Sequence, residues 1–177
     1  MRIFFCSCIL LAVGTSLAGG QNAPVVEARA IIATDATHAN STLKVAVLAN
    51  VAPGFHINDH KPTLDYLIPT ELKFDASNQF AVKNVFYPKG TVVKFPFSDT
   101  PLSVYQNDVT VGVLLEIGKS VPPGGYTLKG KFAYQACNDH ACLPPASVPF
   151  NVALKVVPPD VPLKPQERNV FQRLKFE

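Results

Sequence analysis

Two cysteines near the C-terminal end of the chain are the residues best suited to chemistry. They lie in the segment 134–145, which reads YQACNDHACLPP. Asn138 and Asp139 favour a tight turn between them, and a hairpin of this length brings two Cβ atoms within bridging range. A bridge that closes so short a ring stabilises a fold by only about 2 kcal/mol in the chain-entropy model. The spacing of Cys137 and Cys142 therefore favours a disulfide that opens and closes.

Neither thiol is expected to be strongly acidic. In thioredoxin-type sites a Cys-x-x-Cys motif opens a helix, and the N-terminus of that helix stabilises the thiolate. Here Pro144 and Pro145 follow the second cysteine. They favour extended backbone and remove two N–H donors, so no helix begins at this motif. We expect a pair that reacts because it is presented to a partner, either as the attacked disulfide or as the attacking thiol.

Two other interpretations use the same residues. A single cysteine pair in an exported protein is commonly an inert structural bridge, here within an adhesion or assembly module. Alternatively, Cys137, His140 and Cys142, together with His56, form a Cu(I) or Zn(II) site. The spacing of these residues matches no strong zinc signature. We expect neither a metal nor another cofactor, and the reduction potential of the pair separates the three interpretations.

The N-terminal residues indicate export. A basic residue precedes an apolar run over 3–13, and the triplet 16–18, Ser-Leu-Ala, has the small-x-small pattern of a secretory cleavage site. The apolar run is too short to span a bilayer stably. We expect a signal peptide over 1–18 that removes Cys6 and Cys8. The mature chain then carries one cysteine pair in an oxidising compartment.

Composition excludes several classes of function. The formal net charge of +3 is too small for a nucleic-acid footprint, and no segment combines dense Lys and Arg with stacking aromatic residues. Paired carboxylates, a Ser-His-Asp order and a Gly-rich phosphate loop are not apparent, so hydrolytic and nucleotide-dependent chemistry are unsupported. Beyond the leader there is no second long apolar stretch, and we expect a soluble mature protein.

The elements that must position the cysteines are predicted to be strands. Sixteen prolines and ten glycines argue against long helices. Apolar residues alternate along 109–117 and again along 126–134, as in half-buried strands. Short strands between Pro, Gly, Asn and Asp punctuation predict an all-β fold, an antiparallel β-sandwich. Further strands are expected around Val25–Thr34, Leu43–Leu48, Glu71–Phe74, Phe80–Phe86, Val92–Phe95 and Val148–Val156.

The domain is expected to span 22–157. Residues 158–165, PPDVPLKP, read as an extended linker. The rest of the segment 158–177 is a basic tail with scattered apolar residues. The sequence leaves open whether this tail docks on the domain, contacts a partner or frays.

The cysteine motif and its flanks resemble the N-terminal periplasmic domain of the thiol:disulfide interchange protein DsbD. The motif itself, Tyr-Gln-x-Cys followed by Cys-x-Pro-Pro, is fairly specific. Supporting matches together extend the resemblance over roughly 25–157. They are Gly54–Asn58 with Lys61-Pro62 and Leu67–Thr70, and Tyr87–Gly90 with Ser103–Tyr105.

The resemblance implies an immunoglobulin-like fold and a periplasmic thiol-disulfide oxidoreductase connected with cytochrome c biogenesis. In that family electrons pass from a membrane-embedded thiol reductase to periplasmic thioredoxin-like proteins, and the reactive pair here would be Cys137 and Cys142. The spacing of the pair is one residue shorter than in the best-known member. The eight-span membrane domain and the thioredoxin-like domain are absent from this sequence. We therefore expect a monomer whose donor and acceptor are separate proteins.

The resemblance also implies a cap loop whose aromatic tip covers the disulfide. The corresponding segment is Val93–Ser103, with Phe97 as the expected tip and Phe95 as the second candidate. If this segment is not a cap loop, both aromatics are expected to be core residues.

Further candidates for modulating the pair are His140, His56 and Tyr134. His140 lies inside the loop, where it would bias the thiols or simply be an exposed turn residue. His56 is expected to come close to the loop in the fold, whereas His60 is expected at the surface. Tyr134 is expected beneath the disulfide, and Gln135 is expected to present a strand edge to a partner.

Overall fold

The computed structural model describes residues 24–176, so the expected signal peptide over 1–18 lies outside the described residues. Nearly all of the regular structure in the described part is strand, and its one helix is the single turn α1 (Arg168–Phe171). No helix among residues 24–176 has the length and apolar character needed to cross a membrane.

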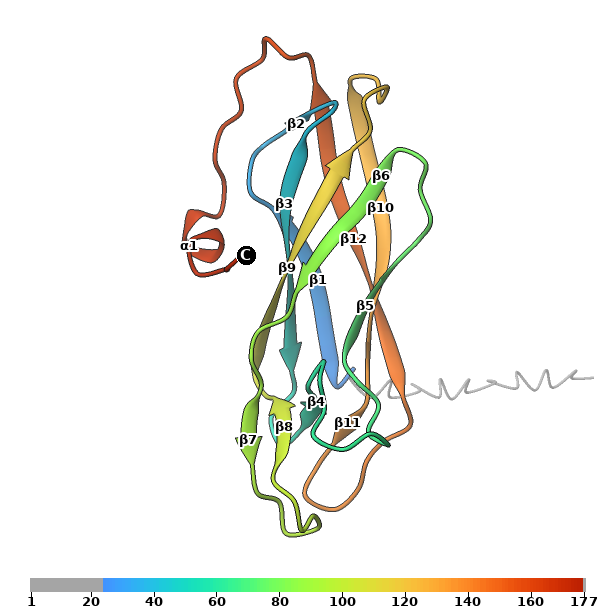
Figure 1. Cartoon of the computed structure of the whole chain (residues 1–177), viewed down its shortest axis with the longest axis vertical. Helices are drawn as coiled ribbons and strands as arrows, with labels where there is room; N and C mark the ends of the chain where they lie inside the picture. The colour runs from blue at the N-terminus through green and yellow to red at the C-terminus, as the bar shows by residue number, and fades with distance from the viewer. Residues whose placement is uncertain (1–23, 177) are drawn as a thin grey trace, which may run out of the picture.

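Two four-stranded sheets form a sandwich, and a third four-stranded sheet lies at one end of it (Figure 1). The strand pairs are antiparallel except for β2 with β12, which is parallel. This arrangement confirms the predicted all-β, immunoglobulin-like antiparallel sandwich. The first sheet has the order β1 (Val26–Ile32), β3 (Thr42–Val51), β9 (Asp108–Ile117) and β6 (Phe80–Phe86). The second has the order β2 (Thr37–His38), β12 (Ala146–Val157), β10 (Gly124–Tyr134) and β5 (Glu71–Phe74). The third, which we call the end sheet, has the order β11 (Ala136–Cys137), β4 (His56–Asn58), β8 (Leu102–Tyr105) and β7 (Thr91–Val93).

The main core lies between the two large sheets. The alternate apolar residues of β9, from Val109 to Ile117, are all buried, as the alternation predicts. They belong to one cluster with Leu128 and Phe132 of β10. Burying a Val, Leu, Ile or Phe side chain contributes about 1.5–3 kcal/mol. The sandwich is thus stable enough to hold the small end sheet and its loops in place.

The predicted strands agree with the structure to different degrees. The strands predicted over 71–74 and 80–86 have the observed bounds of β5 and β6. The strand predicted over Val92–Phe95 is wrong at its C-terminal end, because β7 stops at Val93. Pro96 cannot donate to a ladder, and the chain turns there, with the N–H of Ser98 donating to the Phe95 carbonyl at 3.2 Å. The four strands that were not predicted are β2, β4, β8 and β11.

A buried carboxylate ties the end sheet together. Asp59 directly follows β4, and its oxygens accept hydrogen bonds from the hydroxyls of Ser103 and Tyr105, both at 2.6 Å. They also accept bonds from the backbone N–H groups of Lys61 and Gly90, both at 3.2 Å. Burial alone raises the pKa of Asp59, but these hydrogen bonds outweigh it and the net pKa is lowered. The carboxylate therefore links β4 and β8 and holds the residue that precedes β7.

His60, which was expected at the surface, is half-buried beside this network. Its ring stacks on Tyr87 with a centroid distance of 3.7 Å, and its Nδ1 lies 3.1 Å from the Thr70 carbonyl oxygen. The expectation was wrong because Tyr87, distant in sequence, provides an aromatic face that one-dimensional patterns do not reveal.

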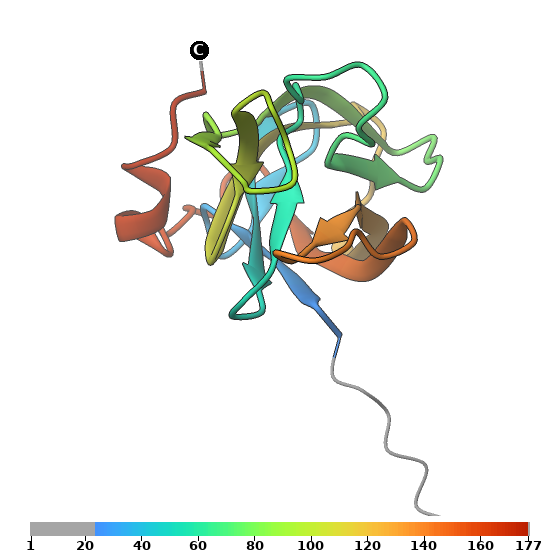
Figure 2. The ribbon, with the colours of Figure 1, turned by 90° about the horizontal axis from the view of Figure 1, so that it is seen from below.

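The C-terminal tail docks on the outer face of the first sheet (Figures 1 and 2). The N–H of Asp35 donates to the Lys164 carbonyl and the N–H of Gln166 to the Ala33 carbonyl. At the end of the tail, the Phe176 ring packs edge-on against Phe86, with centroids 5.6 Å apart. Of the three possibilities for the tail, docking on the domain is the one observed. The tail leaves the end sheet uncovered.

The Asp59 network predicts a pH-dependent loss of stability. Because the folded-state pKa is below the unfolded one, the stabilisation is present above the unfolded pKa of about 3.9 and is lost as pH falls through the folded pKa. Asp59→Asn should lower the free energy of unfolding by about 1–3 kcal/mol at neutral pH. This difference from wild type should shrink steadily in acid. Urea unfolding across pH measures it.

Asp65→Asn, at an exposed carboxylate in the same connecting segment, is the matched control and should change stability by no more than about 0.5 kcal/mol. Equal losses for the two variants would show that the network does not hold the end sheet.

Candidate functional site

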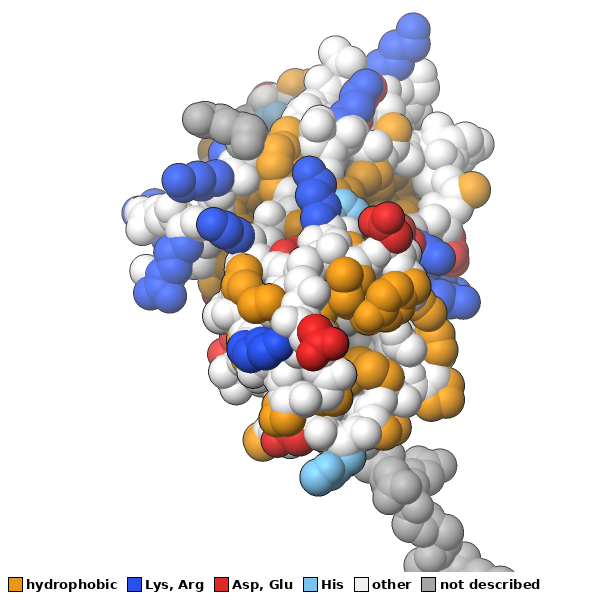
Figure 3. Space-filling model, turned by 60° about the horizontal axis from the view of Figure 1, so that its bottom comes forward, with side chains coloured by type: hydrophobic (Ala, Val, Ile, Leu, Met, Phe, Trp, Pro, Cys, Tyr) orange, Lys and Arg blue, Asp and Glu red, His pale blue; other side chains and the backbone are white. Residues whose placement is uncertain are grey.

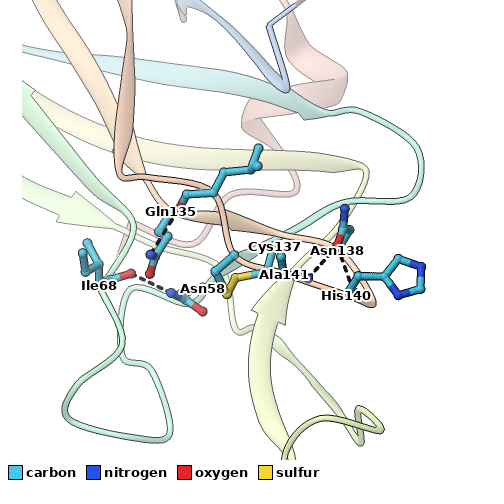
Figure 4. The surroundings of a disulfide bond; sticks show 9 residues. Asn58, Ile68, Gln135, Cys137, Asn138, His140 and Ala141 are labelled. Atoms are coloured by element: carbon cyan, nitrogen blue, oxygen red, sulfur yellow. Dashed lines mark hydrogen bonds between the residues drawn. A yellow bond between two sulfur atoms is a disulfide. The ribbon is translucent and has the colours of Figure 1, made fainter.

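The two cysteines form a disulfide across a tight hairpin at the edge of the end sheet (Figure 4). Cys137 ends β11, and Cys142 pairs with it as an isolated antiparallel bridge. Backbone hydrogen bonds flank the pair on both sides, one between Asn138 and Ala141 and one between Leu143 and Ala136. The cysteines thus occupy a non-hydrogen-bonded pair, the position at which antiparallel backbones approach most closely. Their Cα atoms are 3.9 Å apart.

The turn of this hairpin is built by Asn138. Its side-chain oxygen accepts hydrogen bonds from the N–H groups of His140 and Ala141, both at 2.9 Å. This is the side-chain-to-backbone bonding by which Asn favours turns. The turn residue predicted from the sequence is therefore what brings the two sulfurs together.

The two cysteine residues differ in their exposure to solvent. Cys137 is 2% exposed, whereas Cys142 is exposed. Pro144 and Pro145 continue in extended, exposed backbone, and the described helix α1 packs beside the first sheet, near β3, and not at this hairpin (Figure 1). An incoming thiolate can therefore approach Cys142, while the backbone around the hairpin provides no helix N-terminus to acidify either thiol.

Strand β4 supplies the neighbours of the buried cysteine. In the ladder, Cys137 pairs with His56 and Ala136 pairs with Ile57. Directly paired residues project to the same face of a sheet, and so do residues two apart on one strand. His56 and Asn58 therefore share a face with Cys137, while Ile57 points into the main core. Asn58 is buried beside the disulfide and donates from Nδ2 to the Ile68 carbonyl at 2.9 Å (Figure 4).

His56 is buried and lacks a hydrogen-bond partner at one nitrogen. The residue is 2% exposed, and its Nε2 atom is the only buried side-chain nitrogen or oxygen among residues 24–176 without a partner. Burial lowers the pKa of the His56 imidazole, and the nearby negative charge of Asp139 partly opposes that shift. The ring is therefore mainly neutral at neutral pH.

A loop between β7 and β8 covers His56 with aromatic rings. Phe95 is 5% exposed and stacks on His56 at a centroid distance of 4.2 Å. Phe97 is 48% exposed and stacks on the outer side of Phe95 at 5.1 Å. Lys94 closes the loop by donating from Nζ to the carbonyls of Ser98 and Asp99. Of the two aromatics named from the sequence, Phe95 is thus the inner one and Phe97 the outer one.

The other residues predicted for the site take different places. The His140 ring is exposed and points away from the disulfide (Figure 4). Tyr134 is buried in the main core, and burial raises the pKa of its hydroxyl. The Gln135 side chain donates from Nε2 to the Leu143 carbonyl at 3.3 Å, which braces the hairpin. Asp139 was named only as a turn former and Asn58 only within a matching segment, because the approach of Asp139 to His56 and of Asn58 to the disulfide (Figure 4) arises from pairing between segments far apart in the sequence.

Exposed apolar side chains gather around this end of the molecule (Figure 3). They include Tyr66 and Ile68 from the segment after β4, Phe97 from the cap loop and Leu143 beside the disulfide. Monomeric soluble proteins rarely expose such groups together unless they bind something. We call these four residues the apolar rim.

The metal alternative gains no geometric support. Among residues 24–176 no three His, Cys, Asp or Glu side chains are placed to hold a metal ion together. In addition, both sulfurs are engaged in the disulfide, and His140 points away from them (Figure 4). The arrangement suits disulfide exchange better, with one accessible sulfur and one buried sulfur.

Comparison with known proteins identifies one family. A family model described as the N-terminal domain of the thiol:disulfide interchange protein DsbD matches residues 21–153. No curated protein matches the sequence.

Similar solved structures include the Neisseria meningitidis DsbD N-terminal domain in the reduced form. It is 17% identical, with a TM-score of 0.43, and the match covers 77% of this chain and 90% of that one. The N-terminal periplasmic domain of ScsB from Proteus mirabilis is 15% identical, with a TM-score of 0.48, over 76% of this chain and 47% of that one.

The difference in exposure predicts unequal reactivity in the reduced protein. Iodoacetamide should modify Cys142 at least about tenfold faster than Cys137, because only Cys142 is accessible. The rate for Cys142 should rise with pH toward a midpoint no lower than about 8.5, the unperturbed thiol value. Mass spectrometry of quenched time points measures both. Equal rates, or a Cys142 midpoint below about 6.5, would contradict this reading of the hairpin.

Proposed function

The chain belongs to the family of DsbD N-terminal domains, and from that premise we propose that it is an exported thiol-disulfide interchange protein. Its Cys137–Cys142 pair cycles between disulfide and dithiol and relays electrons between two partners. The observation that carries this proposal is the asymmetric disulfide, with Cys142 exposed at a hairpin and Cys137 buried on β11. A bridge that only stabilised the fold would gain more by joining distant strands.

The exposed sulfur is the one that exchanges. To load the protein, a thiolate of the donor attacks Sγ of Cys142, the bond to Cys137 breaks, and Cys137 leaves as a thiolate that takes up a proton. The donor's second thiolate then attacks its own sulfur in the mixed disulfide and releases Cys142. The donor is oxidised to a disulfide, and this protein receives two electrons as a dithiol. To unload, Cys142 attacks the acceptor's disulfide, and Cys137 resolves the mixed disulfide.

Family membership suggests which proteins are the partners, and the apolar rim suggests where they dock. We assign a membrane-embedded thiol reductase as the donor and periplasmic thioredoxin-like proteins as acceptors. The apolar rim offers a small docking surface next to Cys142. We expect a small interface there, of the size class that suits brief encounters. The protein itself works as a monomer in the periplasm.

The stacked rings over His56 act as the cap of the site. Phe95 covers His56, the residue paired with Cys137, and Phe97 is the displaceable outer ring. A carrier in an oxidising compartment must avoid exchange with unrelated thiols. Because Cys142 itself is exposed, the proposed cover acts from the His56 side of the pair, where it narrows the approach of a thiol until a partner with a matching apolar surface displaces it.

Trapping of partners tests the relay. Cys137→Ser leaves the exposed thiol of Cys142 without its resolving partner, so mixed disulfides should accumulate on it in cells. Cys142→Ser, the matched control, should trap little, since the remaining thiol is buried. Non-reducing electrophoresis and mass spectrometry identify the adducts. If neither variant captured a membrane or thioredoxin-like protein, and the native bridge resisted mild dithiols, the proposed function would be wrong.

Truncation of the outer ring tests the cap. Phe97→Ala should speed the reaction of the disulfide with a small thiol such as glutathione several-fold. Its stability loss should be well below the roughly 3–5 kcal/mol of a core Phe, since the ring is about half exposed. Tyr66→Ala, another exposed aromatic at this end, should leave the rate unchanged. Unchanged kinetics in Phe97→Ala together with a large stability loss would make Phe97 a core residue and not a cap.

A further inference from the structure

The buried cysteine has a proton to exchange and little access to water. Whenever the disulfide forms from the dithiol, Cys137 must lose a proton, and whenever the disulfide opens, Cys137 must gain one. Cys137 is 2% exposed, and the neighbouring His56 is covered by Phe95. A proton acceptor at this sulfur therefore has to come from the protein.

His56 is the titratable side chain placed next to that sulfur. It pairs with Cys137 across the β4–β11 ladder, so the two side chains lie on one face with Cβ atoms about 4.5–5.5 Å apart. Its buried Nε2 has no partner while the cysteines are bridged. A buried polar atom without a partner costs about 1–3 kcal/mol. The thiol of reduced Cys137, on the residue paired with His56, is the partner we expect for this nitrogen, and the cost would then fall on the oxidised state.

The other charged groups around His56 fit this role. The hairpin contributes Asp139, whose negative charge favours the protonated ring, and the exposed His140. The cap loop contributes Lys94, which is bonded to carbonyls of its own loop, and the exposed Asp99. On strand β8, Tyr105 pairs with Ile57 and so lies on the other face from His56, with its hydroxyl donating to Asp59. Of the groups in the described part of the chain, His56 alone combines burial, adjacency to Cys137 and a side-chain nitrogen without a partner.

We propose that His56 is the proton acceptor and donor for Cys137, acting as general base when the disulfide closes and as general acid when it opens. The ring is held neutral by burial, which suits it to accept a proton, and Asp139 stabilises the imidazolium that results. This inference rests on the proposed function and adds to it the residue that handles the proton.

The step that closes the disulfide begins from a mixed disulfide between Cys142 and a partner sulfur. The proton of the Cys137 thiol passes to Nε2 of His56, and the resulting thiolate attacks Sγ of Cys142. The Cys137–Cys142 bond forms, the bond to the partner sulfur breaks, and the partner leaves as a thiolate. The pair is oxidised to a disulfide, the partner sulfur is reduced, and the imidazolium returns its proton to the leaving thiolate or to solvent.

Single-turnover kinetics with 5,5′-dithiobis(2-nitrobenzoate) separate the two halves of this reaction. Reduced protein first forms a mixed disulfide at Cys142 in a step that depends on reagent concentration. It then releases a second thionitrobenzoate in a concentration-independent step, when Cys137 attacks. Below about pH 7, His56→Phe should slow the second step at least about tenfold. General-base catalysis typically contributes about 10²–10⁴-fold, so tenfold is a conservative lower bound. Above about pH 9, where the thiol ionises without help, the two proteins should converge.

The controls distinguish proton transfer from packing. His56→Gln keeps a polar group but cannot accept a proton, so it should follow His56→Phe. His140→Gln, at the exposed histidine of the same hairpin, should follow wild type. Parallel pH profiles for wild type and both His56 variants would overturn the inference. In wild type, the NMR titration of the His56 ring should change on reduction of the disulfide, and an identical titration in both states would overturn it as well.

Failure here is distinguishable from failure of the proposed function. If the first step is absent in wild type, Cys142 does not exchange and the proposed function is wrong. If the first step is normal and the second does not depend on His56, only the role of His56 is wrong.

Discussion

The chemistry of this protein depends on the pairing of two very short strands. β11 and β4 are joined in register so that Cys137 lies opposite His56, and the hairpin that follows places Cys142 directly opposite Cys137. This register fixes which sulfur is buried, which is exposed and which side chain faces the buried one. A shift of one residue would turn these side chains to the other face of the sheet. It would place Ile57, a core residue, beside the disulfide.

So small a pairing cannot maintain itself. Strands of two or three residues are far below the length at which isolated hairpins are stable in water. Three features hold the end sheet in place. The large sandwich anchors it through Ile57 and Ala136, which belong to the main core. The Asp59 carboxylate ties β4 to β8, and a buried apolar cluster of Phe95, Leu102 and Val104 packs beneath the loop between β7 and β8. The reactive hairpin is thus presented on a rigid support, while Phe97 and the turn remain exposed.

Much of the fold and part of the site could be predicted from the sequence. Alternation reveals long half-buried strands such as β9 and β10, because a period of two persists over many residues. It cannot reveal β4 or β11, which are too short to show any period. The cysteine motif points to the pair that we propose to be reactive, yet not to the difference in exposure between Cys137 and Cys142. That difference, like the stacking of His56 on Phe95, arises from contacts between segments about 40 to 80 residues apart.

The central claim is that the Cys137–Cys142 disulfide is exchangeable and does not serve only as a structural bridge. Its reduction potential, measured by equilibrating the purified protein with defined thiol-disulfide buffers, tests this most directly. Known exchange proteins span about −120 to −270 mV, and structural bridges of secreted proteins lie below about −300 mV. An exchangeable Cys137–Cys142 disulfide should give a value within the first range. A value below about −300 mV would identify a structural bridge and contradict the central claim.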